Sequence, residues 1–226
     1  MFKNLTNEEC SYLYGLFITD GFLTTRQRDN GKIDYSLGIE LQEKDKDILE
    51  KIYQLLPEGH IYSRIRDTNF KTNYSCYSFY YLKQDFLLWL IEKGFPLKNK
   101  TENACPPNWE YDENAFWRGV IDGDGSIGLR YTRNILYPFI SLTTKSEPLK
   151  LAYHEYLLKT INFNEKNHRN KRDNIYNITI CNNRAMLLGE NLYKNATIFL
   201  DRKHNEYLNC IEHQKNKIKE KENKNE

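Results

Sequence analysis

The chain has little of what several common protein classes require. Its five cysteines are scattered and none is paired at CxxC spacing, which argues against both a disulfide framework and a zinc knuckle. The histidines are isolated as well, so the sequence gives no support to a zinc enzyme or a Cys/His hydrolase. No apolar run is long enough to span a bilayer, and the N-terminal residues contain no apolar signal core. We therefore expect a soluble intracellular protein of the cytoplasm or an organelle matrix, with no membrane partner.

A large excess of charge of either sign is also absent. The formal net charge is +2 although 28% of the residues are charged, so the strongly basic signature of many nucleic-acid-binding domains is missing. The charges are nevertheless unevenly distributed. Acids concentrate in the helical segments 40–50 and 102–113, while the predicted strands carry more arginine and lysine. Basic strands beside acidic helices give one positive face on a nearly neutral protein.

What the chain does contain is one short pattern that occurs twice. GLFITDG at residues 15–21 and GVIDGDG at residues 119–125 each end an apolar helical stripe, and each finishes with an acid followed by glycine. The match extends outward, with Tyr12 aligned to Phe116. A segment repeated once at long spacing indicates two similar halves rather than a solenoid.

Both halves are predicted to have the same order of elements. A capping box of Thr6 and Glu9 starts a helix that runs to about Asp20, and alternation with turn signals then indicates two hairpins, each followed by an amphipathic helix. This αββαββα order is typical of an α+β unit with an antiparallel sheet. The predicted strands of the second half cover residues 126–132, 136–144, 165–169 and 174–181.

The repeat also divides the chain into units. The segment around Pro106-Pro107 has no periodicity, which indicates a linker. Residues after Ile211 include almost nothing apolar, which predicts either a frayed helix or a disordered tail. The expected units are a first half over residues 1–97, a linker over 98–113, a second half over 114–211 and a polar tail over 212–226.

Asp20 and Asp124 end the two repeated helices. A carboxylate at a helix C-terminus faces the negative end of the helix dipole, which costs from a few tenths to about 1 kcal/mol, and a nearby cation reverses that sign. If the helices pack side by side, the two acids emerge together at the root of both sheets and offer oxygen ligands to a hard divalent ion such as Mg²⁺. The alternative is that both acids only cap turns, but two copies in the same register favour a metal site.

Small residues four positions apart support side-by-side packing of these helices. Gly15 with Thr19, and Gly119 with Gly123, lie along one ridge of each helix, where small residues let two backbones approach closely. Asp122 has no acidic counterpart in the first copy of the pattern, so we interpret it as peripheral rather than catalytic.

Residues 117–125 resemble the LAGLIDADG motif of homing endonucleases, and residues 13–21 are a looser copy of it. The first copy departs from the motif at Ile18, in place of the first acid, and at Tyr14, in place of a small residue. The last acid before glycine is intact in both copies. The doubled motif resembles the single-chain, pseudo-symmetric members of the family over about residues 5–210. The resemblance implies two αββαββα halves related by a pseudo-twofold axis, whose antiparallel sheets form a DNA-binding saddle.

The resemblance also implies which residues act at the centre of the protein. Asp20 and Asp124 would hold Mg²⁺, with Mn²⁺ or Ca²⁺ as substitutes, and would be catalytic. Glu43 and Thr144 match the polar position that helps to place the attacking water in this family. The candidate metal ligands implied in this way are Asp20, Asp124, Thr19 and Gly123.

A lysine that follows the third helix of a half contributes to the site in this family. Lys98 occupies that place in the first half and is the candidate catalytic lysine. In the second half Asp201 stands opposite Lys98, so that either Arg202 or Lys203 acts there or the second half lacks the function. Lys203 is therefore included among the candidate catalytic residues.

DNA contacts are expected on one face of each sheet. Alternation places polar side chains on one face and apolar side chains on the other, as in any half-buried antiparallel sheet. Here the polar faces are rich in Arg, Thr, Ser and Asn and poor in acids, which suits phosphates and major-groove base edges. The candidate DNA contacts are Thr24, Arg26, Arg28, Arg64, Arg66, Ser126, Arg130, Thr132, Lys145, Asn177 and Thr179.

These observations predict a monomeric, metal-dependent, site-specific endonuclease acting on double-stranded DNA with a long pseudo-palindromic target. By resemblance, it would leave short 3′ overhangs and be encoded by an intron or a free-standing mobile gene. Two alternatives stay open. One is an intron RNA maturase on the same scaffold, with RNA as partner, and the other is a nuclease-dead DNA-binding regulator. Retention of both acids weighs against each alternative without excluding either.

Overall fold

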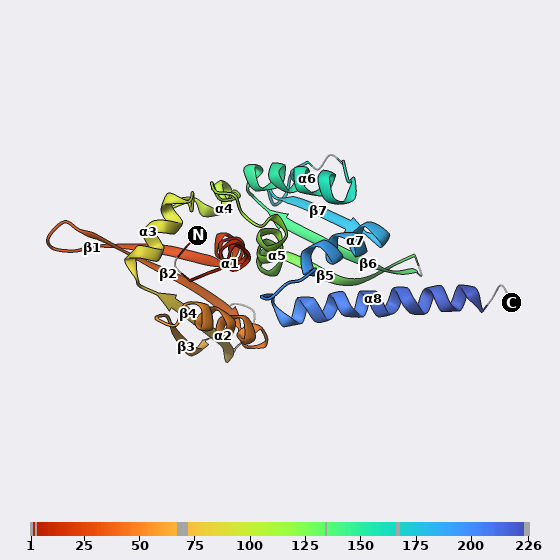
Figure 1. The fold of residues 1–226 in the computed structure, drawn as a ribbon, viewed down its shortest axis with the longest axis horizontal. Coiled ribbons are helices and arrows are strands. Elements are labelled where there is room, and N and C mark those ends of the chain that lie inside the picture. The colour runs from red at the N-terminus through yellow and green to blue at the C-terminus, as the bar shows by residue number, and fades with distance from the viewer. Residues whose placement is uncertain (1, 3, 67–71, 134, 166–167, 224–226) are drawn as a thin grey trace.

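The protein is described here by a computed structural model that covers residues 2, 4–66, 72–133, 135–165 and 168–223. Two helices, α1 and α5, lie side by side at the centre, and an antiparallel sheet extends from each of them (Figure 1). The fold is α+β with two repeated halves, as the sequence predicted. Among the described residues, no helix is both long and apolar enough to cross a membrane.

The first half contains the central helix α1, a sheet and two further helices. In chain order the elements are α1 (Asn7–Thr19), β1 (Gly21–Gln27), β2 (Ile33–Gln42), the short 3₁₀ helix η1 (Glu43–Asp45), α2 (Lys46–Leu55), β3 (His60–Arg66), β4 (Tyr74–Tyr81) and α3 (Gln84–Glu92). The described strands form a sheet of order β1-β2-β4-β3 with antiparallel pairing throughout. The capping box predicted for α1 is present, because the Thr6 hydroxyl accepts from Glu9 N while the Glu9 carboxylate accepts from Thr6 N.

The second half repeats this plan with one strand fewer in the described part of the chain. After the short helix α4 (Lys100–Asn103), its elements are α5 (Glu113–Asp124), β5 (Gly125–Thr132), β6 (Ile135–Thr144), α6 (Glu147–Ile161), β7 (Tyr176–Cys181), α7 (Asn182–Tyr193) and α8 (Asp201–Glu222). The described strands form an antiparallel sheet of order β5-β6-β7.

The strand predicted over residues 165–169 is wrong for the residues that the structure describes. Residues 165, 168 and 169 lie outside any strand, and residues 166–167 fall outside the described part of the chain. The physical reason is visible in the sequence, since no apolar residue stands between Phe163 and Ile175. A strand on this sheet needs apolar side chains at alternate positions to bury against the helices.

Helix α8 is longer than the sequence pattern predicts. It runs through residues 212–222, where a frayed helix or disorder was expected. Its first part is anchored because Lys203, Tyr207 and Cys210 are buried at helical spacing. That stripe is the pattern from which a helix beginning near residue 201 was predictable.

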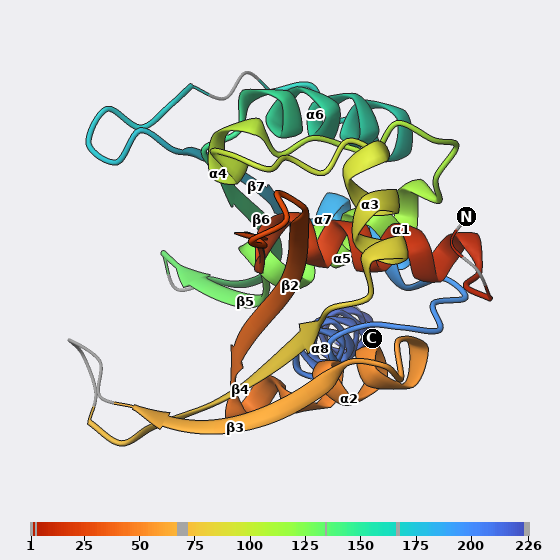
Figure 2. The ribbon, with the colours of Figure 1, turned by 90° about the vertical axis from the view of Figure 1, so that its left-hand side faces the viewer.

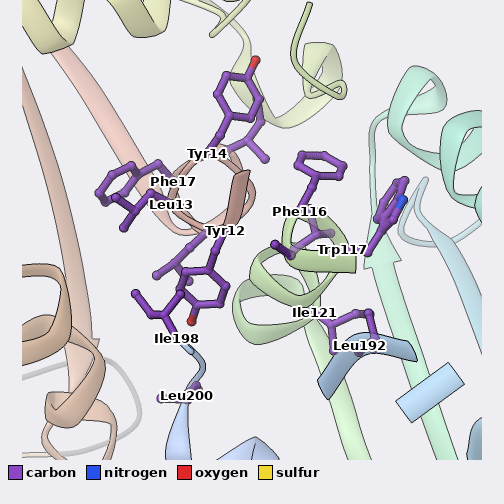
Figure 3. Packing of buried hydrophobic residues seen from close by; sticks show 14 of the residues in the cluster. Tyr12, Leu13, Tyr14, Phe17, Phe116, Trp117, Ile121, Leu192, Ile198 and Leu200 are labelled. Atoms are coloured by element: carbon purple, nitrogen blue, oxygen red, sulfur yellow. The ribbon is translucent and has the colours of Figure 1, made fainter. Parts of the chain in front are cut away.

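The two central helices touch backbone to backbone. A Cβ added at Gly15 would lie 2.2 Å from the carbonyl oxygen of Phe116, and one added at Gly119 would lie 2.3 Å from that of Tyr12. The predicted close approach along one ridge is therefore confirmed. Larger side chains point away from this contact: in Figure 3, Phe17 points from α1 toward the first half and Trp117 points from α5 toward the second.

The contact predicts the effect of adding a single methyl group. We expect Gly119→Ala to lower the free energy of unfolding by about 2 kcal/mol, because overpacking outweighs the gain in helix propensity of up to about 1 kcal/mol. Urea unfolding of the wild type and of Gly119→Ala would measure this change in stability. The control is Gly128→Ala, where the nearest atoms to an added Cβ are 3.7 Å away, so that little change is expected. Unchanged or increased stability of Gly119→Ala would contradict the contact.

Candidate active site

Asp20 and Asp124 lie together where the central helices pass into their sheets. Asp20 is the C-cap of α1, and Asp124 is the last residue of α5. A Cβ added at Gly123 on α5 would lie 3.4 Å from an oxygen of the Asp20 carboxylate, so that this side chain reaches the opposite helix. Figure 2 shows α1 and α5 side by side, with the strands curving away from their C-terminal ends on one side of the molecule.

Both carboxyl groups are less acidic than usual. Burial raises the pKa of Asp20 to about 6, and the negative charge of Asp124 adds to the shift. Burial also raises the pKa of Asp124, although this residue is the more exposed of the two. Two carboxylates that share a partly dry site at the negative ends of two helix dipoles favour any nearby positive charge.

Two lysines supply positive charge at this place. The Lys203 ammonium donates to the carbonyl oxygens at the end of α5, at 2.6 Å to Ile121, 2.5 Å to Asp122, 3.3 Å to Gly123 and 2.8 Å to Gly125. Lys100 donates in the same way to the end of α1, to Phe17, Ile18 and Thr19. Each lysine thus donates to carbonyl groups at a helix end that have no partner within the helix, and the Ile121 oxygen accepts from the Gly125 N–H as well.

Between Asp20 and Asp124, each lysine has its larger electrostatic effect on the aspartate of the other central helix. Asp20 is stabilised in its ionised form more by Lys203 than by Lys100, whereas Asp124 is stabilised more by Lys100 than by Lys203. Burial lowers the pKa of both lysines, and nearby acids oppose that shift. The four groups therefore form one electrostatic unit that neither half contains alone.

The lysine that the structure brings to this place in the first half is Lys100, not Lys98. Lys98 is exposed, and its backbone oxygen accepts from the Asn103 side chain. Lys98 was predicted for this place, but the chain reaches the end of α1 only two residues later, at the start of α4. The sequence contained a signal for this, since the register that aligns Lys98 with Asp201 also aligns Lys100 with Lys203.

Asp122 holds α8 in place. Its Oδ2 accepts 2.8 Å hydrogen bonds from the Tyr12 hydroxyl and from the backbone N–H of Leu200, which precedes α8. Burial raises the pKa of Asp122 to about 6. The hydrogen bond to Leu200 fixes the segment that leads into α8 and therefore fixes Lys203. Ile18, at the matching place in α1, has no side-chain group that could accept such a bond.

A charged clamp joins the start of α8 to the first half. The Arg202 guanidinium donates to both oxygens of Asp45, at 2.7 and 3.0 Å, and Lys51 donates to the Asp201 carboxylate at 2.5 Å. A cavity of about 290 Å³ lies beside the clamp and reaches Asp20. The second half is thus fixed against the first directly next to the two acids.

The other central candidates, Glu43 and Thr144, lie where β2 and β6 end. Glu43 is exposed at the start of η1, and Thr144 is buried and accepts from the N–H of Ser146, which stabilises the turn into α6. The carbonyl oxygens of Thr19 and Gly123 both accept from the lysines. The Thr19 hydroxyl donates to carbonyl oxygens within α1. The role of Thr19 as a metal ligand stays a prediction.

Strand pairing places most of the expected DNA contacts on one open face of each sheet. Thr24 and Arg26 share a face of the first sheet with Arg64, while Arg28 follows β1 and pairs with Asp34. The side chain of Arg66 lies outside the described residues. The matching face of the second sheet carries Ser126, Arg130, Thr132, Thr179 and Asn177, and Lys145 is exposed beyond the end of β6.

Two neighbouring lysines give a matched test of this geometry. We expect Lys100→Met to lower the free energy of unfolding by about 1–3 kcal/mol, because partly buried helix-end carbonyls lose a charged donor. Lys98→Met, two residues away and exposed, should change it by less than about 0.5 kcal/mol. Urea unfolding of both variants decides the matter, and equal effects would contradict the placement of Lys100.

Comparison with known proteins agrees with the sequence pattern and the fold. The LAGLIDADG-like domain family matches this chain twice, over residues 7–91 and 112–187. A search of curated proteins gave no match.

Solved structures of LAGLIDADG meganucleases are similar to this chain. The chain aligns with I-AabMI bound to uncleaved DNA at a TM-score of 0.59 and 13% identity, covering 94% of this chain and 92% of that chain. For I-CpaMI bound to uncleaved DNA the TM-score is 0.55 at 11% identity, covering 88% and 89%. I-SmaMI bound to an uncleaved DNA target in the presence of calcium ions gives 0.52 at 13% identity, covering 89% and 85%. At such identities the likeness shows a shared fold.

The two stretches matched by the family cover more than half of the chain, and each contains one helix that ends in aspartate and glycine before its sheet. The same two helices form the glycine contact and carry the paired acids. The chain belongs to the LAGLIDADG family.

Proposed function

We propose that this protein is a site-specific endonuclease that uses divalent metal ions to cut both strands of a DNA duplex. The observation that carries the proposal is the pair of acids, Asp20 and Asp124, held together at the root of two sheets. The related meganucleases are described as bound to DNA, and one of them was solved with calcium ions. A monomer suffices for this function because both halves of the site come from one chain.

The donor set fits a hard divalent cation. The described residues contain no cluster of three His, Cys, Asp or Glu side chains that could hold a metal without other ligands. Two carboxylates are nevertheless what Mg²⁺ uses when water and substrate phosphate complete its coordination. Burial raises the pKa of each acid more than the two lysines lower it, so a bound cation would stabilise the ionised forms further. Asp20 and Asp124 would hold the ion, with Mg²⁺ the proposed species.

The residues around the two acids have different proposed roles. When bound, a divalent ion supplies Lewis-acid stabilisation of the attacking and leaving oxygens. Lys100 and Lys203 hold the helix ends, and their charges favour the ionised form of the acids. Because Lys203 is 4% exposed, it acts through this field rather than by reaching the phosphate itself. Polar faces of the two sheets position the duplex over the acids.

The test uses a pool of long random duplexes with Mg²⁺, scoring cleavage and retention separately. We expect discrete double-strand breaks from the wild type, and a loss of at least about a hundredfold in Asp20→Asn and in Asp124→Asn with binding retained. Glu50→Gln, which removes an exposed ion pair with Lys46 within α2, is the control and should cut normally.

Each other outcome has a definite meaning. Tight duplex binding without cleavage in either Mg²⁺ or Mn²⁺ would replace the enzyme by a DNA-binding regulator. Neither binding nor cleavage of duplexes would exclude the proposal and direct the search to RNA, as expected of a maturase. Loss of cleavage in only one of the two aspartate variants would contradict a site in which both acids are required.

A further inference from the structure

The open face of the first sheet carries an unusual row of aromatic side chains. Strand pairing aligns Phe22 with Gly38, Gly38 with Tyr80, and Tyr80 with His60, so that these residues cross the described sheet from β1 to β3. Tyr62 follows on the same face of β3, opposite Ser78. We call Phe22, Tyr80, Tyr62 and His60 the aromatic row.

The rings of the aromatic row contact one another and remain open to solvent. The ring centroids of Phe22 and Tyr80 are 5.9 Å apart, and those of Tyr80 and Tyr62 are 6.0 Å apart, both in edge-to-face geometry. Phe22 is 37% exposed and Tyr62 is 56% exposed. Contiguous apolar surface of this kind on a soluble protein marks an interaction site.

Sheet stability explains only part of the aromatic row. A Cβ added at Gly38 would lie 2.3 Å from the ring of Phe22, so Phe22 covers the backbone where this glycine provides no side chain. Aromatic cover of a strand glycine stabilises a sheet. Tyr62 covers no glycine, and more than half of its surface is exposed, so its presence calls for a partner.

The second half has hydroxyl groups at the matching positions. The residue after the Asp-Gly pair is Phe22 in the first half and Ser126 in the second. Ser126 pairs with Ser141, and Ser141 pairs with Thr179, which gives a row of hydroxyls across β5, β6 and β7. The two open faces are therefore chemically different where the strands leave the two acids.

The surroundings of the aromatic row favour duplex DNA as the partner. Arg26 and Arg64 lie on the same face, where their charge suits phosphates, and Glu40 on this face lies 3.8 Å from the Arg64 guanidinium. The row begins two residues after Asp20, so a duplex whose backbone reaches the acids extends over it. The apolar feature of base edges in the major groove is the C5 methyl group of thymine, which apolar side chains recognise by contact.

We propose that the aromatic row contacts thymine methyl groups in the major groove of one half of the DNA target. The inference rests on the proposed function, because it requires that the first sheet lies on duplex DNA. It adds that the target is chemically asymmetric: the half under the first sheet contains thymines read through their methyl groups. Under the second sheet, hydroxyl groups face hydrogen-bonding base edges instead.

The test replaces each thymine of a selected target duplex, one at a time, by deoxyuridine, which lacks only the C5 methyl group. Binding is measured in Ca²⁺ to separate it from cleavage. We expect the dissociation constant of the wild type to rise about three- to tenfold for at least one replacement in one half of the target, as removal of a buried methyl contact should give. In Tyr62→Ala or Phe22→Ser, the thymine and uridine duplexes should bind alike at that position.

The matched control is Tyr131→Ala. Tyr131 is 67% exposed but alternates with Arg130 on β5, which puts it on the opposite face of its sheet, so its loss should leave methyl sensitivity unchanged. Two results overturn the inference while leaving duplex binding intact: no methyl sensitivity in the wild type, or sensitivity that persists in both row variants. Tighter binding of single-stranded RNA than of duplex, lost in Tyr62→Ala, would overturn it in favour of base stacking. Absence of any duplex binding would instead refute the proposed function.

Discussion

The backbone contact between α1 and α5 is the constraint on which the rest of the structure depends. Gly15 and Gly119 leave no side chain between the two helices at this point, so the backbones of α1 and α5 are in direct contact. Each helix passes directly into the first strand of its own sheet, and the spacing of the helices therefore sets the spacing of the sheets. Because Asp20 and Asp124 stand at these two exits, the same contact creates the paired acids.

Placing the two aspartates together is electrostatically unfavourable, and lysines from outside α1 and α5 offset part of this cost. Two partly desolvated carboxylates meet at the negative ends of two dipoles, which is why burial and mutual repulsion raise the pKa of Asp20. The balancing charges come from segments far away in the sequence, Lys100 at α4 and Lys203 at α8. Asp122 and the clamp of Asp45 with Arg202 fix α8 so that Lys203 arrives at the correct place. This repulsion lowers the stability of the fold and would favour the divalent cation of the proposed function.

Local patterns were sufficient to predict the doubled helix-to-sheet units, the paired acids and the open faces of the sheets, since each depends on residues close together in the sequence. Features that depend on contacts between segments far apart in the sequence were not predicted. Lys98 and Lys100 both lie in a polar segment, and the match of Lys100 with Lys203 gains its meaning only once the path into α4 shows that Lys100 reaches the end of α1. Helix α8 gains its stability from one buried stripe against α7 and β5, so its polar remainder resembled a tail. The aromatic row becomes visible only when strand pairing puts Phe22, Tyr80 and Tyr62 next to one another.

The helix contact makes Asp20 and Asp124 one interacting site, and a double-mutant cycle measures the free energy of their interaction directly. The folded-state pKa of Asp20 is about 6 against a reference value of 3.8, so its ionised form opposes folding at pH 8 in metal-free buffer, and the same direction holds for Asp124. Each single Asn variant should therefore be more stable than the wild type. The double variant should gain less than the sum of the two by roughly 1 kcal/mol, because the repulsion is removed only once. Additive gains, within about 0.3–0.5 kcal/mol, would show that the acids do not interact and would contradict the account.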